Sequence, residues 1–146
     1  MTVTFSDPSP QLSAVLQFYE AITNWKFDVV EELFSDDYIH TTLPSSAKEP
    51  PKDKAQGLAH AKGLAAALGY TPLKYEILQL NESKESVWVH SKLHGEGPGG
   101  ASFANESIFI FTLRSSGDKI KIAAVQDFVD TKQAADAAAA AAAAQQ

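Results

Sequence analysis

Residues 117–130 read Gly-Asp-Lys-Ile-Lys-Ile-Ala-Ala-Val-Gln-Asp-Phe-Val-Asp, a pattern that predicts a turn followed by a β-strand. Successive side chains of a strand point to opposite faces, which places four residues on one face: Ala123, Val125, Asp127 and Val129. The Asp127 carboxylate is therefore expected to face the interior among apolar neighbours. A buried carboxylate needs a hydrogen-bonding partner or a chemical role, so this residue is the first candidate for function.

Three more strands are predicted upstream, at residues 73–80, 86–94 and 102–114, before the last one at 120–129. The segments between them are short and rich in turn-forming residues, with a glycine-rich link at 95–100. Short links of this kind favour antiparallel hairpins. The second half of the chain is therefore predicted to be a four-stranded antiparallel meander.

The first half is mainly helical. Apolar residues recur every three to four positions from Leu12 to about Asn24, again in a short helix from Phe27 to Phe34, and in a third helix over 54–68. Residues 35–37 are expected to stop the second helix, 38–43 to form a short strand and 44–53 to form a loop. This order predicts an α+β fold, with three helices against one face of a strongly curved, mainly antiparallel sheet.

Composition excludes several classes of protein. The 146 residues favour one domain at 10–131, with a lead-in at 1–9 and an alanine-rich low-complexity tail at 132–146. A net charge of −6 without a block of Lys or Arg argues against nucleic-acid binding. Cysteine is absent, and neither a signal peptide nor a membrane span is predicted, so we expect a cytoplasmic protein. Nothing in the sequence demands a metal or another cofactor.

Three stretches resemble the SnoaL-like group of the nuclear-transport-factor-2-like superfamily, over residues 11–130. Residues 18–21 with 28–34 look like the opening helix pair of that group, and residues 35–40 look like its entry to the first strand. Residues 111–113 with 121–122 and 127–130 look like its closing hairpin. The resemblance implies a cone-shaped barrel in which the sheet wraps the first helix and leaves an apolar pocket at the open end. It also implies that the convex face of the sheet forms a homodimer.

The alternation along two predicted strands agrees with this picture. Val89 would point inward with its neighbours at 87, 91 and 93, and so would Asn105, Ser107, Phe109 and Phe111 on the next strand. The opposite face would carry Trp88, His90, Ile108 and Ile110. Because this apolar patch is large for a solvated surface, we expect it to be the interface of a homodimer. The alternative is that the C-terminal tail covers it.

Two residues are candidates for catalysis. In epoxide-hydrolase and cyclase members of the superfamily, an Asp at the position of Asp127 faces the pocket and acts as an acid or base, which suits proton transfer. The alternative is an Asp that caps a turn or bonds a buried hydroxyl. The group often has a His or Tyr at the position of His40, at the pocket mouth, where a His is suited to moving protons near neutral pH. The alternative is a His that satisfies backbone groups at a strand end.

Other residues are candidates for binding a substrate. Tyr38 shares the face of His40 and could donate a hydrogen bond to a substrate oxygen, and an inward Asn105 could polarise a carbonyl. The resemblance places Tyr19 and Trp25 over the pocket, although core packing is the alternative for both. The predicted wall of the pocket consists of Val89, Phe109, Phe111 and, on the third helix, Leu64.

The sequence leaves three functions open. The first is a cofactor-independent isomerase, cyclase or dehydratase, in which Asp127 moves a proton on an apolar oxygenated metabolite. The second is a non-catalytic binder of an apolar ligand, and the third is a dimeric adaptor without a ligand. Neither the water-activating carboxylate pair of the epoxide hydrolases nor the complete polar set of the dehydratases is matched, because Ser91-Lys92-Leu93 replaces part of the first. The sequence names no substrate.

Overall fold

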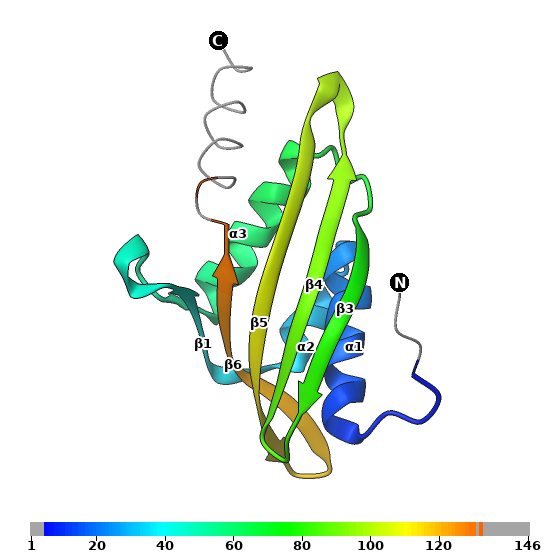
Figure 1. The fold of residues 1–146 in the computed structure, drawn as a ribbon, viewed down its shortest axis with the longest axis vertical. Coiled ribbons are helices and arrows are strands. Elements are labelled where there is room, and N and C mark those ends of the chain that lie inside the picture. The colour runs from blue at the N-terminus through cyan, green and yellow to red at the C-terminus, as the bar shows by residue number, and fades with distance from the viewer. Residues whose placement is uncertain (1–4, 131, 133–146) are drawn as a thin grey trace.

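Three helices pack against one face of a six-stranded mixed sheet in the computed structural model, which describes residues 5–130 and 132 (Figure 1). The helices are α1 (Pro10–Thr23), α2 (Phe27–Leu33) and α3 (Lys54–Ala67). The strands, in the spatial order β2-β1-β6-β5-β4-β3, are β1 (Phe34–Leu43), β2 (Lys52–Asp53), β3 (Lys74–Glu82), β4 (Ser86–Glu96), β5 (Ser102–Ser116) and β6 (Lys119–Val129). The predicted α+β class is confirmed, and the sheet is not closed.

The sheet joins two kinds of pairing. Strands β3 to β6 form the predicted antiparallel meander, and each end lies within two residues of its predicted position. Strand β1 returns beside β6 in a parallel pairing that aligns His40 with Val125 and Thr42 with Asp127. A parallel pair needs a long crossover connection, and here the meander and α3 supply it. This pairing brings residues some 85 positions apart onto neighbouring strands.

Sequence signals mark where α1 and α3 begin. The Ser9 hydroxyl accepts a hydrogen bond from the backbone N–H of Leu12, and Pro10 occupies the first turn of α1. Asp53 and Gln56 form a capping box at the start of α3, with hydrogen bonds of 2.9 Å in both directions. These caps satisfy backbone donors that would otherwise lack partners.

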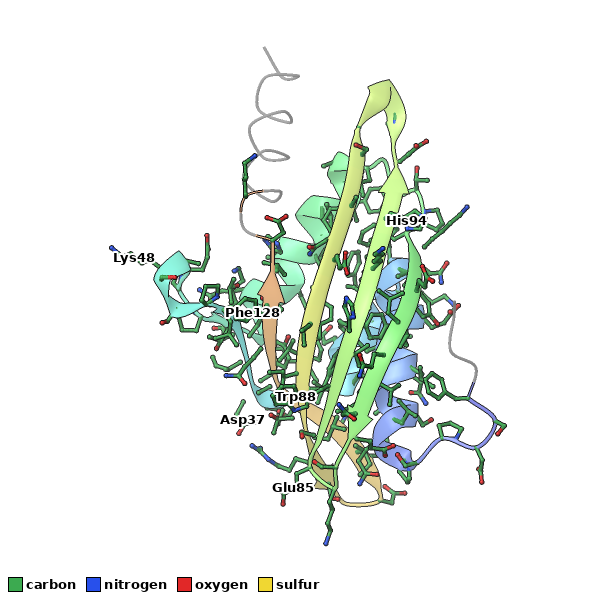
Figure 2. The ribbon with its side chains drawn as sticks, in the orientation of Figure 1. Asp37, Lys48, Glu85, Trp88, His94 and Phe128 are labelled. Carbon is green, nitrogen blue, oxygen red and sulfur yellow. The ribbon has the colours of Figure 1, made fainter. Side chains whose placement is uncertain are left out.

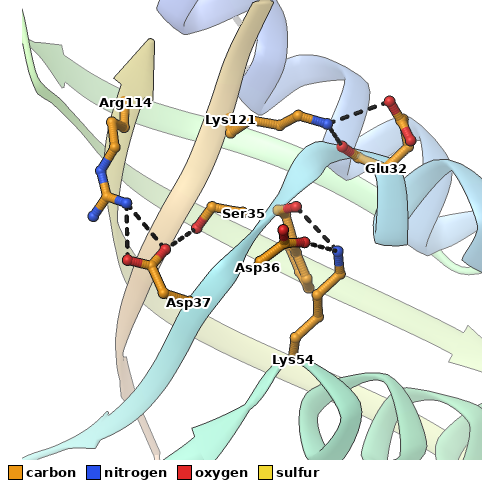
Figure 3. A network of polar contacts seen from close by, with 8 residues as sticks. Glu32, Ser35, Asp36, Asp37, Lys54, Arg114 and Lys121 are labelled. Atoms are coloured by element: carbon orange, nitrogen blue, oxygen red, sulfur yellow. Dashed lines mark hydrogen bonds and ion pairs between the residues drawn. The ribbon is translucent and has the colours of Figure 1, made fainter. Parts of the chain in front are cut away.

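The start of β1 corrects the sequence-based prediction. Residues 35–37 do not act as a stop, because the strand begins at Phe34, directly after α2. Lysine side chains cap the exposed carbonyls of this junction: Lys121 donates to the carbonyl of Glu32, and Lys54 donates to that of Phe34 at 3.2 Å (Figure 3). Asp37 is held in the strand by two hydrogen bonds from Arg114. Both contacts involve residues distant in sequence, which the local pattern does not reveal.

The predicted loop at 44–53 is also more ordered than expected. It contains a 3₁₀ turn at Ser45–Ala47 and the two-residue strand β2, in which Lys52 and Asp53 pair with His40 and Ile39. The predicted lead-in at 1–9 and the alanine-rich tail at 132–146 lie partly or almost wholly outside the described residues. Within the described part, no helix is long and apolar enough to cross a membrane.

Burial along β5 shows which end of the sheet is open. The face covered by the helices, here called the inner face, carries Phe111 and Leu113 fully buried near the β5–β6 turn. Toward the β4–β5 hairpin the inner-face residues Phe103 and Asn105 are only half-buried. The hairpin end is therefore the wide end of the cone, and the β5–β6 turn lies at its narrow end. The hairpin projects at the top of the view in Figure 1.

Gly97 holds the β4–β5 hairpin against the C-terminal end of α3. A Cβ atom at this position would lie 2.8 Å from both the Cα and the carbonyl oxygen of Leu68, which is backbone that cannot rotate away. Gly63, inside α3, has no atom within 4 Å of its own missing Cβ and is exposed. The two glycines therefore provide a matched pair for testing this contact.

We expect Gly97→Ala to lower the free energy of unfolding by about 1–3 kcal/mol, because the added methyl group must push the hairpin off α3. Gly63→Ala should raise it by about 0.5–1 kcal/mol, because Ala has the better helix propensity. Urea unfolding followed by circular dichroism measures both. A neutral Gly97→Ala would show that the hairpin does not rest on α3 as described.

Candidate functional site

Asp127 and His40 form a buried pair on the inner face near the wide end. His40 Nε2 lies 2.7 Å from Asp127 Oδ2, although the two residues are 87 positions apart. The parallel register explains this contact, because Asp127 follows the partner of His40 by two residues and so shares its face. A carboxylate only accepts hydrogen bonds, so His40 Nε2 carries the hydrogen and donates it. Solvent reaches only 19% of the His40 side chain and 11% of the Asp127 side chain.

Two buried oxygen atoms at this place have no protein hydrogen-bond partner among the described residues. They are Asp127 Oδ1 and Ser107 Oγ, in residues that are 8% and 3% exposed. Asp127 pairs in register with Phe109 on β5, so Ser107 is its diagonal neighbour on the inner face. Buried polar groups are nearly always hydrogen-bonded, so these two oxygens mark a place where a polar ligand could bind.

Tyr38 lies on the β1 side of this pair. Its ring stacks on Phe34 with centroids 3.8 Å apart and planes 5° apart, and it packs over Gly57 of α3. Burial raises the pKa of the Tyr38 hydroxyl above its ordinary value, and the negative charge of Asp127 raises it further. The hydroxyl therefore stays protonated near neutral pH and can donate a hydrogen bond.

Tyr19 projects from α1 into the centre of the cone, where its hydroxyl already has a partner. Its oxygen lies 2.9 Å from Ser91 Oγ, and burial raises its pKa despite the opposing effect of this hydrogen bond. The ring of Tyr19 contacts Phe109 and Phe111 with centroids about 6 Å apart. With Phe111 and Val89 completely buried, this part of the predicted pocket wall is packed core.

The remaining predicted binding residues lie at the wide end or on α3. Asn105 is half-buried and faces inward, two residues beyond Ser107 along β5. The Trp25 indole N–H donates to the backbone carbonyl of Thr71 at 2.8 Å, which ties the end of α1 to the segment after α3. Leu64 packs partly buried against the core. The structure therefore brings His40, Asp127 and Ser107 together and leaves Asn105 farther from the carboxylate.

His60 of α3 lies at the rim of the site. The residue is exposed, but the protein around its ring lowers its pKa by desolvation, and the neighbouring Lys52 and His40 act in the same direction. Asp127 raises the pKa by a smaller effect. His60 therefore experiences the charge of both members of the pair.

The pocket expected at the open end coincides with neither of the two hollows described for this structure. Two surface hollows occur elsewhere: one on the outer face beside Ile108 and Phe128, the other at the narrow end around Asp36, Lys54 and Arg114. Neither hollow contains His40 or Asp127. A ligand would reach Asp127 from the wide end, where the inner-face residues are half-buried. In the described part of the chain, no group of three or more His, Asp or Glu side chains could hold a metal ion.

The outer face carries the predicted apolar patch and adds one residue to it. We call Trp88, Ile108, Ile110 and Phe128 the outer apolar patch. Trp88 and Phe128 are each 50% exposed and Ile108 is 43% exposed (Figure 2). The register places Ile108 directly between His90 and Phe128. His90 Nε2 lies 2.7 Å from Glu106 Oε1 on the same face.

Sequence reasoning placed Ser107 inward without making it a site candidate, and it did not assign Phe128 to the outer face, although a signal was present for each. Ser107 is a polar residue at an inward position of an otherwise apolar strand, and Ser91 is a second one on β4. Phe128 alternates outward next to Asp127. What the sequence lacked was the register that places Ser107 beside Asp127 and Phe128 beside Ile108.

Comparisons with solved structures identify the same fold in proteins of low sequence identity. The BvnE pinacolase from Penicillium brevicompactum is 16% identical, with a TM-score of 0.77 over 94% of this chain and 97% of that one. Wild-type IdmH from Streptomyces antibioticus, a candidate polyketide cyclase, is 14% identical, with a TM-score of 0.67 over 90% and 99%. TerC, co-crystallised with polyporic acid, is 16% identical, with a TM-score of 0.68 over 88% and 97%. No protein with a curated description matches the sequence.

A family model also matches the amino-acid sequence itself. The model that matches residues 15–123 describes a SnoaL-like domain. The matched segment runs from α1 to the middle of β6 and covers well over half of the chain. The resemblance read from the sequence is thereby confirmed, and the chain belongs to the SnoaL-like family.

Proposed function

We propose that this protein is a cofactor-independent enzyme that moves a proton on an apolar, oxygenated small molecule bound at the inner face. The observation that carries the proposal is the buried Asp127 carboxylate, which His40 holds through Oδ2 while Oδ1 has no protein partner. An oriented carboxylate in a poorly solvated place is suited to general acid–base catalysis. Isomerisation, cyclisation and dehydration all require such a step.

In the proposed reaction Asp127 Oδ1 removes a proton from a carbon next to a carbonyl group. His40 fixes the orientation of the carboxylate through Oδ2, which leaves the lone pairs of Oδ1 directed at the ligand. The carbonyl oxygen gains negative charge as the proton leaves, and a hydrogen-bond donor must stabilise that charge. The candidate donors are Tyr38 on β1, whose raised pKa keeps it protonated, and the unpartnered hydroxyl of Ser107 on β5.

Asn105 takes a different part in this proposal. It lies four positions before Phe109, the register partner of Asp127, which corresponds to about 13 Å along the strand. Asn105 is therefore assigned to the far end of an elongated ligand, together with Trp25 and Leu64. The apolar walls near the reacting group come from Phe109 and the rings behind it.

The structural relatives support this class of function. BvnE is a pinacolase, IdmH is a candidate polyketide cyclase and TerC was crystallised with a small organic acid. Each of these has the fold of this chain, so the frame accommodates small oxygenated molecules. Because the fold is reused for many activities, the proposal depends on the Asp127 site and not on the likeness alone.

A dimeric adaptor without a ligand is the second candidate, and the filled centre of the cone favours it; a non-catalytic binder of an apolar ligand needs the same space as an enzyme. The rings of Tyr19, Phe109 and Phe111 occupy the space that an enzyme would need for a bulky substrate. A binder would show a ligand-dependent rise in melting temperature without turnover. An adaptor would show neither.

We also propose that the protein is a homodimer through the outer apolar patch. Trp88, Ile108 and Phe128 are large apolar side chains that remain about half exposed on one face of β4, β5 and β6. Burying such a patch against its own copy stabilises a dimer, and His90 with Glu106 would provide polar contacts at its edge. The tail remains the alternative cover, and it lies outside the described residues.

The acid–base role can be tested without knowing the natural substrate. A panel of apolar ketones in deuterium oxide is incubated with the protein, and proton NMR follows the exchange of hydrogens next to the carbonyl. We expect the wild type to accelerate exchange in at least one ketone, and Asp127→Asn to slow it by about 10²–10⁴-fold while circular dichroism stays unchanged. Asp118→Asn, an exposed carboxylate at the β5–β6 turn, is the matched control and should exchange at the wild-type rate. Equal rates for Asp127→Asn and the wild type would disprove the assignment.

The dimer is tested by a single charge in the outer apolar patch. Trp88→Glu should shift the mass measured by light scattering from two chains to one, because a buried carboxylate in an apolar interface is unfavourable. Gln17→Glu adds the same charge on the exposed side of α1 and should leave the mass unchanged. A wild-type protein that is already monomeric would remove the basis of this proposal.

A further inference from the structure

Hydroxyl and carboxylate groups form a row across the otherwise apolar inner face. The row runs from Tyr19 through Ser91 on β4 and Ser107 on β5 to Asp127 on β6, and ends at His40 on β1. Both ends of the row are closed by hydrogen bonds, at 2.9 Å between Tyr19 and Ser91 and at 2.7 Å between His40 and Asp127. Only its middle lacks partners, at Ser107 Oγ and Asp127 Oδ1.

The two unpartnered oxygens differ in the hydrogen bonds that they can make with a ligand. An ionised carboxylate is an acceptor only, so its ligand partner must be a donor such as a hydroxyl group. A serine hydroxyl can donate a hydrogen bond, so its partner on the ligand can be a carbonyl oxygen. Diagonal neighbours on a sheet face lie about 7–8 Å apart at the backbone, and each hydrogen bond spans about 2.8 Å. A ligand that joins both oxygens is therefore short, and two polar groups on adjacent carbons fit this span.

We infer that the ligand is an apolar α-hydroxy ketone, with its hydroxyl group on Asp127 and its carbonyl oxygen on Ser107, so that Ser107 determines specificity for the carbonyl. The inference rests on the proposed function, because it places the ligand at Asp127. The carbon that bears the hydroxyl group is also the carbon next to the carbonyl, so the acidic C–H lies beside the carboxylate. The half-buried ring of Phe109, the register partner of Asp127, covers the apolar part of the ligand.

Ser107 is preferred over the two donors considered from the sequence. Tyr38 lies on β1, on the opposite side of β6 from Ser107, and its ring is stacked on Phe34. Asn105 is farther along β5 and only half-buried. Ser107 combines deep burial, a hydroxyl without a protein partner and a position diagonal to Asp127.

Three related probes separate the two contacts. They are 1-hydroxy-1-phenylpropan-2-one, 1-phenylpropan-2-one, which lacks the hydroxyl group, and 1-phenylpropan-1-ol, which lacks the carbonyl. Their dissociation constants are measured on the full chain by amide chemical-shift titration. We expect the hydroxy ketone to bind about three- to tenfold more tightly than the alcohol and at least tenfold more tightly than the ketone, because the second contact is to a charged group.

Variants assign each preference to a residue. Ser107→Ala should abolish the preference for the hydroxy ketone over the alcohol and keep the preference over the ketone. Ser91→Ala removes a neighbouring buried hydroxyl that Tyr19 already occupies, so it should leave both preferences unchanged. Ser107→Thr keeps the hydroxyl group and should restore the preference if Ser107→Ala perturbs packing.

Three results would overturn the inference. One is loss of the carbonyl preference in Tyr38→Phe instead of Ser107→Ala, and another is equal affinity for all three probes. The third is absence of binding by every probe to a folded protein, which would mean that the free oxygens bind water only. The deuterium-exchange assay reports on the proposed function separately: Asp127-dependent exchange with unchanged probe preferences in Ser107→Ala would disprove the role of Ser107 alone. Intact probe preferences without deuterium exchange would disprove the proposed enzymatic activity.

Discussion

The parallel pairing of β1 with β6 is the constraint on which the site depends. Asp127 alone would be a carboxylate buried on an apolar face, and burying a charge without a partner is strongly unfavourable. The register of β1 supplies His40 to that carboxylate at 2.7 Å. The register of β1 against β6 shifts between Phe34 and Ile39, so the alignment of His40 with Val125 is set by the pairing of residues 39–43. This pairing lies downstream of the junction where Lys121 and Lys54 bind the carbonyls of Glu32 and Phe34.

The cone has a packed end and a half-open end, and the row of polar groups from Tyr19 to His40 lies between them. Toward the β5–β6 turn the inner face is closed by Phe111 and Leu113, which gives the sheet a stable core. Toward the β4–β5 hairpin the burial decreases, and a ligand can exchange with solvent there. Asp127 and Ser107 lie where the apolar core ends, so the core desolvates them while the half-buried residues of the wide end lie next to them. A site at either extreme would be fully solvated or inaccessible.

The sequence predicted what alternation and spacing control, and it did not predict what register controls. The period of two along residues 120–129 placed Asp127 inside, and the same rule correctly placed Trp88 and Ile108 outside. The rule could not show that residues 35–37 belong to a strand, because Lys121 and Arg114 stabilise that strand from β6 and β5. It could not single out Ser107 either, since an inward serine is informative only when its neighbour across the sheet is known. His40 was a candidate by resemblance, and only the parallel pairing showed its contact with Asp127.

The two faces of the sheet are coupled through the same backbone. Ile108 and Phe128 of the outer apolar patch are the chain neighbours of Ser107 and Asp127 on the inner face. Side chains alternate along a strand, so a slip of one residue between β5 and β6 would turn the Asp127 carboxylate to the outer face and Phe128 to the inner face. Contact of a second chain with the outer face would therefore hold the register that keeps Ser107 and Asp127 adjacent. Association and ligand binding are in this way expected to stabilise each other, even though no side chain of the outer apolar patch reaches the site.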